Sequence, residues 1–166
     1  MRLFIASKAT IDEYTRIKER FERSIDGRWV EEKNLHLTWY FIGESETPDR
    51  YIRVIDTLPI PEKETPLSGL GIFERRKNHI LYASIPRLSD EWKDTLEKLQ
   101  IYSNRKFTPH VTLCRIKKIY DKKMLYDSIR HYSGKRIGKI ANGISLIESH
   151  LHKNGVEYET IYEKVI

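Results

Sequence analysis

Two short segments of the sequence share the pattern His-x-Thr followed by an apolar residue. One covers residues 36–39 (HLTW) and the other covers residues 110–113 (HVTL). Histidine has an ordinary pKa of about 6.5, so at one pH one copy can take a proton while another donates one. Threonine hydroxyls can donate hydrogen bonds to phosphate oxygens as charge builds up on them. Together these groups suit a phosphoryl transfer without a metal, such as the opening of a 2′,3′-cyclic phosphate.

Both segments lie in stretches rich in β-branched and aromatic residues, which predicts strands over 35–42 and 110–116. Side chains two positions apart on a strand face the same side. His36 therefore shares a face with Thr38, and His110 with Thr112. The same alternation places Cys114 on the face of His110, where we interpret it as a small core residue. It turns Arg115 to the opposite face unless the strand bends.

The elements that would position these strands repeat in the same order in both halves of the chain. Thr10 and Glu13 are interpreted as a capping box at the start of a helix expected at 10–24. Ser89 is interpreted as the cap of a helix expected at 89–101. The region 58–66, with three prolines, is interpreted as a loop. The first half predicts a strand at 2–7, a helix at 10–24, a strand at 35–42, a helix at 48–57 and a strand at 67–74. The second half predicts a strand at 80–85, a helix at 89–101, a strand at 110–116, a helix at 121–132, strand material at 137–150 and a final edge strand at 157–165.

This repetition predicts an α+β fold with two similar lobes related by an approximate two-fold axis. Each lobe would be an antiparallel sheet with helices on its outer face, and the two histidines would converge on the cleft between the lobes. We expect one domain over residues 1–166, with lobes built from repeats at about 1–75 and 76–166.

The composition sets limits on the class of protein. The chain has 166 residues, 39% of them hydrophobic, and a net charge of +6, which favours polyanionic partners such as RNA or DNA. The single cysteine rules out an internal disulfide. No apolar run approaches the roughly 18 residues that span a bilayer, and the amino-terminal segment is too short and polar for a secretory signal. We expect a cytoplasmic monomer with no membrane contact and no obligate protein partner.

Several segments resemble one known family, the 2H phosphoesterases, and within it the RNA 2′,3′-cyclic phosphodiesterases, also called 2′-5′ RNA ligases. Residues 34–44 (NLHLTWYFIGE) are similar to the first family block, usually NLHITLKFLGE, and residues 107–115 (FTPHVTLCR) to the second, typically FxPHITLxR. The opening RLFIA and residues 144–158 (ISLIESHLHKNGVEY) resemble the terminal blocks. The departures are apolar or aromatic and lie at Trp39, Ile42 and Tyr82.

The resemblance implies a two-lobed α+β fold and a phosphoric diester hydrolase that converts a terminal 2′,3′-cyclic phosphate into a 2′-phosphomonoester without a metal or other cofactor. It implies His36 as proton donor and His110 as proton acceptor, and it gives Arg115 a phosphate-binding or structural role. Thr38 and Thr112 would hold the phosphate. The substrate would be RNA with cyclic phosphate ends, with tRNA halves and cyclic nucleotides as alternatives. Two other functions stay open: a 2′-5′ RNA ligase joining tRNA halves, and a non-catalytic module that binds RNA ends.

Two further groups of residues have weaker patterns. Arg75 and Arg76 lead into the second repeat and could bind the RNA backbone, although a solvated loop explains them equally well. His150 and His152 would share one strand face and could bind a metal. No cysteine, aspartate or third histidine lies close in sequence, so we expect no metal site there.

Overall fold

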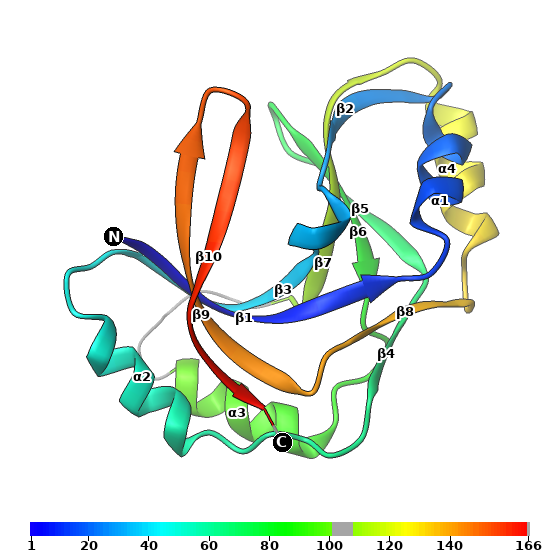
Figure 1. Ribbon diagram of the computed structural model, residues 1–166. Coiled ribbons are helices and arrows are strands. Elements are labelled where there is room, and N and C mark those ends of the chain that lie inside the picture. Colours follow the sequence, from blue (N-terminus) through cyan, green and yellow to red (C-terminus); the bar gives the residue numbers. More distant parts are fainter. Residues whose placement is uncertain (101–107, 166) are drawn as a thin grey trace.

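The computed structural model describes residues 1–100 and 108–165, in which ten strands and four α-helices form (Figure 1). The strands are β1 (Arg2–Ile11), β2 (Ile25–Trp29), β3 (His36–Glu44), β4 (Thr65–Ser68), β5 (Leu70–Phe73), β6 (His79–Ser84), β7 (His110–Ile119), β8 (Arg136–Ile140), β9 (Gly143–His152) and β10 (Gly155–Val165). The helices are α1 (Tyr14–Phe21), α2 (Pro48–Thr57), α3 (Asp90–Gln100) and α4 (Lys122–His131), with a 3-10 turn, η1 (Glu32–Asn34). None of these helices is long and apolar enough to cross a membrane.

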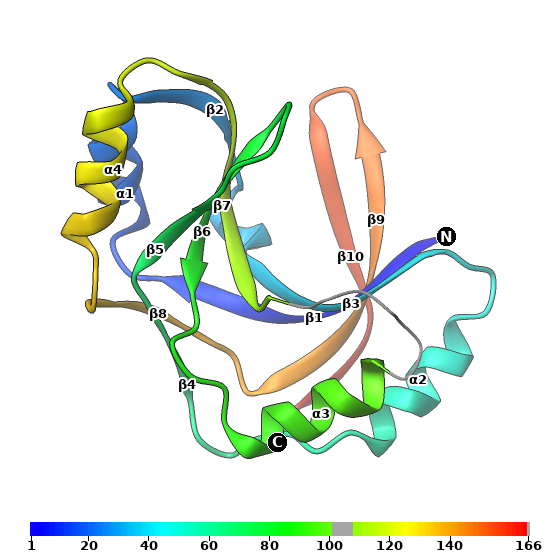
Figure 2. The ribbon, with the colours of Figure 1, turned by 180° about the vertical axis from the view of Figure 1, so that it is seen from behind.

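The strands form one curled antiparallel sheet in the order β10-β9-β1-β3-β7-β6-β5, while β2 pairs with β7, and β8 pairs with β1 and β4. The β9–β10 hairpin stands on one side of the molecule, and β2, β5, β6 and β7 stand on the other (Figures 1 and 2). Helices α2 and α3 cover the sheet below, and α1 and α4 lie side by side on the outside. This confirms the predicted α+β fold with two antiparallel lobes.

The two halves of the chain interleave between the two sides of the sheet. Strand β9, from the second half, pairs with β1, and β2, from the first half, pairs with β7. One side is therefore β10-β9-β1-β3 and the other is β2-β7-β6-β5. A boundary near residue 75 describes the order of elements along the chain, but each side draws strands from both repeats. The assignment of residues 1–166 to a single domain stays our proposal.

The structure confirms some predicted elements and corrects others. The helix over 48–57 has the predicted bounds, and the Trp92 amide donates to Ser89 Oγ at 3.2 Å, as expected of the cap of α3. Helix α3 was expected to end at residue 101, which lies outside the described residues. The strand predicted at 67–74 is two strands separated by Gly69, whose φ of 77° is in the left-handed region.

The predicted capping box at Thr10 is wrong. Strand β1 continues to Ile11 because Thr10 pairs with Lys139 of β8. The close approach depends on Gly138, where a Cβ would lie 2.1 Å from the Thr10 carbonyl oxygen. Helix α1 instead follows Glu13, whose φ is 51° and whose side chain forms no cap hydrogen bond. Residues 25–29, after α1, form a strand, so tertiary pairing overrides the helical pattern on both sides of α1.

Candidate active site

The two His-x-Thr strands meet at the centre of the sheet. Leu37 of β3 pairs with Val111 of β7 in antiparallel register, and both side chains are 0% exposed. Their neighbours are half-buried and project to the opposite face, as strand alternation requires. Extending the register places His36 across from Thr112, and places Thr38 across from His110. The structure thus brings together the four residues predicted from the motifs.

Both imidazoles are oriented by the same backbone contact. His36 Nδ1 lies 2.7 Å from the carbonyl oxygen of Asn34, and His110 Nδ1 lies 2.7 Å from that of Thr108. A carbonyl oxygen can only accept, so in each ring Nδ1 carries the hydrogen and donates it. Nε2 is therefore the ring nitrogen that remains available to a ligand in each case.

Aromatic rings from neighbouring strands hold each imidazole in place. The His36 ring centroid lies 5.1 Å from that of Phe4 on β1 and 5.3 Å from that of Tyr158 on β10. His110 contacts Phe73 on β5 at 5.0 Å and Tyr82 on β6 at 5.7 Å. Phe4 and Tyr158 lie in segments that resemble the family blocks and Phe73 does not, but the sequence placed none of them beside a histidine, because these contacts depend on which strands become neighbours.

The environment favours the neutral form of both histidines. Burial is the largest effect and lowers the pKa of His36; the Asn34 hydrogen bond raises it, and the positive charges of His110 and Arg115 lower it further. Burial also lowers the pKa of His110, against the hydrogen bond to the Thr108 carbonyl, and nearby Arg75 and Arg115 add to the lowering. The charge of Arg115 lowers the pKa of both rings, and the charge of His110 also lowers that of His36. These three groups are therefore close enough to act on one another within one site.

A β-bulge turns Arg115 toward the histidines. Thr112 pairs with Tyr82 and Cys114 with Leu81, so Leu113 is an extra residue without a partner in β6. Leu113 and Cys114 are consequently both 0% exposed, and Arg115 returns to the exposed face. The parity prediction was wrong for Cys114, which faces the core. For Arg115 the stated exception applies, because the strand bends and Arg115 faces the same side as His110. The interpretation of Cys114 as a core residue is confirmed.

The other two predicted arginines lie in the exposed turn between β5 and β6. Arg75 is close enough for its charge to lower the pKa of His110, and its amide donates to His79 Nδ1 at 3.2 Å. Arg76 is the next residue in the same exposed turn. The substrate-binding roles of Arg75, Arg76 and Arg115 stay predictions.

A pocket of about 290 Å³ lies next to His36. Lys8 of β1 and Lys33 of η1 contribute positive charge to its lining and Glu157 contributes negative charge. Polar groups come from Asn34, Tyr158 and Thr160. Sequence reasoning missed both lysines. The only available signal was that Lys33 and Asn34 directly precede the first motif.

Comparison with known proteins identifies related phosphoesterases. The family model for LigT-like phosphoesterases matches residues 5–82. An RNA 2′,3′-cyclic phosphodiesterase of Aquifex aeolicus is 31% identical over 176 residues, covering 96% of this chain and 93% of the relative. One from Methanocaldococcus jannaschii is also 31% identical, over 175 residues, covering 98% and 99% respectively.

Solved structures show the same fold at lower identity. The protein TT0787 of Thermus thermophilus superposes with a TM-score of 0.69 at 19% identity, covering 98% of this chain and 96% of that one. E. coli LigT complexed with 3′-AMP superposes with a TM-score of 0.68 at 20% identity, with the same coverage. The resemblance drawn from the two His-x-Thr motifs is confirmed, and the chain belongs to the LigT-like 2H phosphoesterase family.

Proposed function

We propose that the protein is an RNA 2′,3′-cyclic phosphodiesterase that hydrolyses a terminal cyclic phosphate to a 2′-phosphomonoester. The observation that carries this proposal is the convergence of His36 and His110 on one face of two adjoining strands, each with Nδ1 held by a carbonyl. The names of the relatives from Aquifex aeolicus and Methanocaldococcus jannaschii support the same activity.

The proposed reaction needs one base and one acid. His110 Nε2 takes a proton from water as the water oxygen forms a bond to phosphorus. The bond from phosphorus to the ribose 3′ oxygen breaks, and His36 Nε2 protonates that departing oxygen. Thr38 and Thr112 donate hydrogen bonds to the non-bridging oxygens, where negative charge increases. The 2′ oxygen keeps the phosphate, which gives the 2′-phosphomonoester.

The lowered pKa values fit this division of roles. Without substrate both imidazoles favour the neutral form, so a base is available near neutral pH. A bound phosphodiester brings a negative charge that favours protonation of one ring, and mutual repulsion disfavours protonation of the second. Substrate binding therefore generates the acid–base pair that the reaction requires.

The charge distribution supports RNA as the substrate. Lys8 and Lys33 line the pocket beside His36 together with one carboxylate, that of Glu157, and the chain carries a net charge of +6. Such groups attract the phosphates of a longer strand. We propose RNA ends as the substrate class, with tRNA halves and cyclic nucleotides as the forms to be tested. Action as a monomer in the cytoplasm, without an obligate protein partner, stays part of the proposal.

The direct test is incubation with the four nucleoside 2′,3′-cyclic phosphates and a cyclic-ended oligonucleotide, with chelator present. We expect turnover of the cyclic ends, a 2′-phosphate product and no loss of rate from chelation. A 3′-phosphate product or no turnover would contradict the proposal. An added 5′-hydroxyl strand tests for ligation, since a joined product would identify the ligase. Binding of RNA ends without turnover would identify the non-catalytic module, which the intact pair of motifs argues against.

A further inference from the structure

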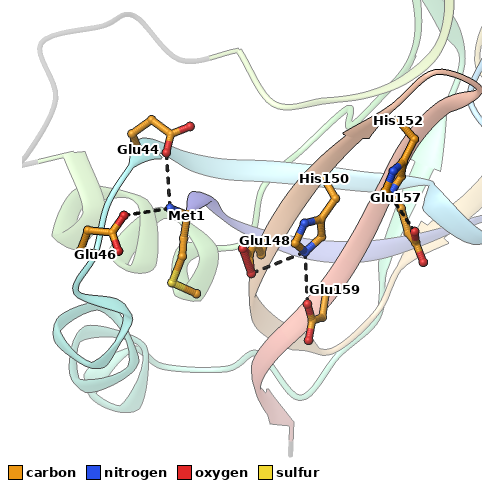
Figure 3. A network of polar contacts seen from close by, with 8 residues as sticks. All are labelled: Met1, Glu44, Glu46, Glu148, His150, His152, Glu157 and Glu159. Atoms are coloured by element: carbon orange, nitrogen blue, oxygen red, sulfur yellow. Dashed lines mark hydrogen bonds and ion pairs between the residues drawn. The ribbon is translucent and has the colours of Figure 1, made fainter.

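A second cluster of ionisable side chains lies on the β9–β10 hairpin. In the hairpin register Glu159 pairs with Glu148, and Glu157 pairs with His150. Because residues two apart share a strand face, these four side chains and His152 project to one side. Figure 3 shows His150 between Glu148 and Glu159, and His152 beside Glu157.

Three of these side chains converge closely enough to bind one ion. His150 Nε2 lies 3.2 Å from Glu159 Oε2 and 3.6 Å from Glu148 Oε2, and the three ligand atoms lie within 4.8 Å of one another. A tetrahedral zinc site with bonds of about 2.0–2.2 Å has ligand atoms about 3.3 Å apart. Two of the three separations are already close to that value, so small side-chain rotations suffice.

The negative charges of the cluster also favour a bound cation. Glu148 and Glu159 are like charges directly opposite each other on an antiparallel pair, an arrangement that destabilises a sheet. The Glu148 side chain is only 15% exposed, so water screens it poorly. The nearby amino terminus contacts Glu44 and Glu46, each at 3.3 Å (Figure 3).

We propose that Glu148, His150 and Glu159 form a binding site for a divalent transition-metal ion, with Zn²⁺ as the best fit to one imidazole and two carboxylates. His152 is not one of the three converging side chains, because it lies 3.0 Å from Glu157 and its ring centroid is 6.5 Å from that of His150. We therefore assign the remaining coordination position of the ion to water. The site goes beyond the proposed hydrolysis. Tyr158, which contacts His36, lies between Glu157 and Glu159 and projects to the opposite face of the strand. The ion thus fastens the hairpin without touching the reacting phosphate.

The test uses the full chain after removal of metals with a chelator. Isothermal titration with ZnCl₂ should give one site, and saturating Zn²⁺ should raise Tm by about 5 °C or more at a hundredfold excess over Kd. Mg²⁺ should not reproduce this rise. Glu148→Gln and Glu159→Gln should each weaken Zn²⁺ binding about tenfold or more. The matched control Glu163→Gln, on the same strand, should bind like the parent protein.

Three results would overturn the proposal: no heat of binding at about 100-fold molar excess of Zn²⁺, a Tm unaffected by Zn²⁺, or binding that both glutamine variants leave unchanged. The last would place the ion elsewhere, for example at His36 and His110. Circular dichroism of each variant checks that the fold is retained. Hydrolysis should proceed in the chelator-treated protein, so failure of the metal site and failure of the proposed function are distinguishable.

Discussion

The two His-x-Thr strands resemble each other closely, and their differences define the site. In both strands the histidine Nδ1 contacts the carbonyl two residues earlier, at 2.7 Å. Both also carry a bulge at the fourth motif position. In β7 the register with β6 shifts at Leu113, and in β3 the register with β1 shifts at Trp39, between the Thr38–Ala6 and Tyr40–Ile5 pairs. The repeat thus reproduces the ring orientation and the local bend of the strand.

The strands diverge one step beyond the bulge. Arg115, five residues after His110, has its equivalent in Phe41, five residues after His36. The charge of Arg115 lowers the pKa of both histidines, whereas Phe41 is 50% exposed and lies under the guanidinium of Arg2 at 5.4 Å. The shared features provide two proton-transfer groups. The difference places a guanidinium at this position of β7 and an aromatic ring at the equivalent position of β3, so the two strands do not present the same groups to an anionic substrate.

The largest effect should come from removing either imidazole. His36→Ala and His110→Ala should each reduce kcat by about 10²–10⁴-fold, because each removes one half of an acid–base pair. The double variant should lose little more than the worse single variant, since the pair acts as a unit. The control is His131→Ala, at an exposed histidine on α4. Turnover close to that of the parent protein in either single variant would contradict the claim that the reaction needs both histidines.

The next largest effect is expected at Arg115, the position where the two strands differ. Arg115→Gln should reduce kcat/KM by about tenfold or more, because it removes a charge that acts on both histidines and on the bound phosphate. It should also raise both histidine pKa values, since the positive charge of Arg115 lowers them. The low-pH limb of the kcat/KM profile, where the base becomes protonated, should therefore move to higher pH.

Phe41→Ala is the matched variant for Arg115→Gln, at the equivalent position of β3. It should leave the low-pH limb in place, because it removes no charge near the histidines. An equal displacement in both variants would show that the two positions do not differ in the way proposed.

The bulge in β7 should depend on Gly27. A Cβ at this position would lie 2.4 Å from the Arg115 carbonyl oxygen and 2.8 Å from Cys114 Sγ. Gly27→Ala should therefore lower the free energy of unfolding by about 1–3 kcal/mol, measured by urea denaturation. Asp26→Asn, at the exposed neighbouring position, serves as the control and should unfold like the parent protein. Equal stability of the two variants would mean that β2 does not constrain the bulge.

The smallest effect is expected at the tyrosines beside the two imidazoles. Tyr82→Phe and Tyr158→Phe keep the rings that contact His110 and His36 and remove only the hydroxyl groups. Each should change kcat by less than about threefold. A loss comparable to that of a histidine variant would reveal a hydroxyl that takes part in proton transfer on that side.

Both the α+β fold and the positions of the two motif strands followed from the sequence, but the pairing of distant strands did not. The structure places the side chains of His36, Thr38, His110 and Thr112 on the predicted faces of their strands. Strand alternation is a local property, and the two strands pair at Leu37 and Val111, between these residues. The orientation of Arg115 could not be predicted, because an unpaired residue in β7 is defined by its partners in β6. The interleaving of the halves was missed because it depends on which distant strands pair. Glu148, two residues before His150, could have been noticed from strand alternation, whereas the position of Glu159 depends on the register of the β9–β10 hairpin.

The most direct test of the central claim is a crystal structure with a 2′-nucleotide product bound. We predict that Nε2 of His36 and Nε2 of His110 each lie about 2.6–3.2 Å from oxygens of the same phosphate group, on opposite sides of the phosphorus atom. A phosphate that contacts only one of the two rings, with the other ring turned away or out of reach, would contradict the two-histidine mechanism.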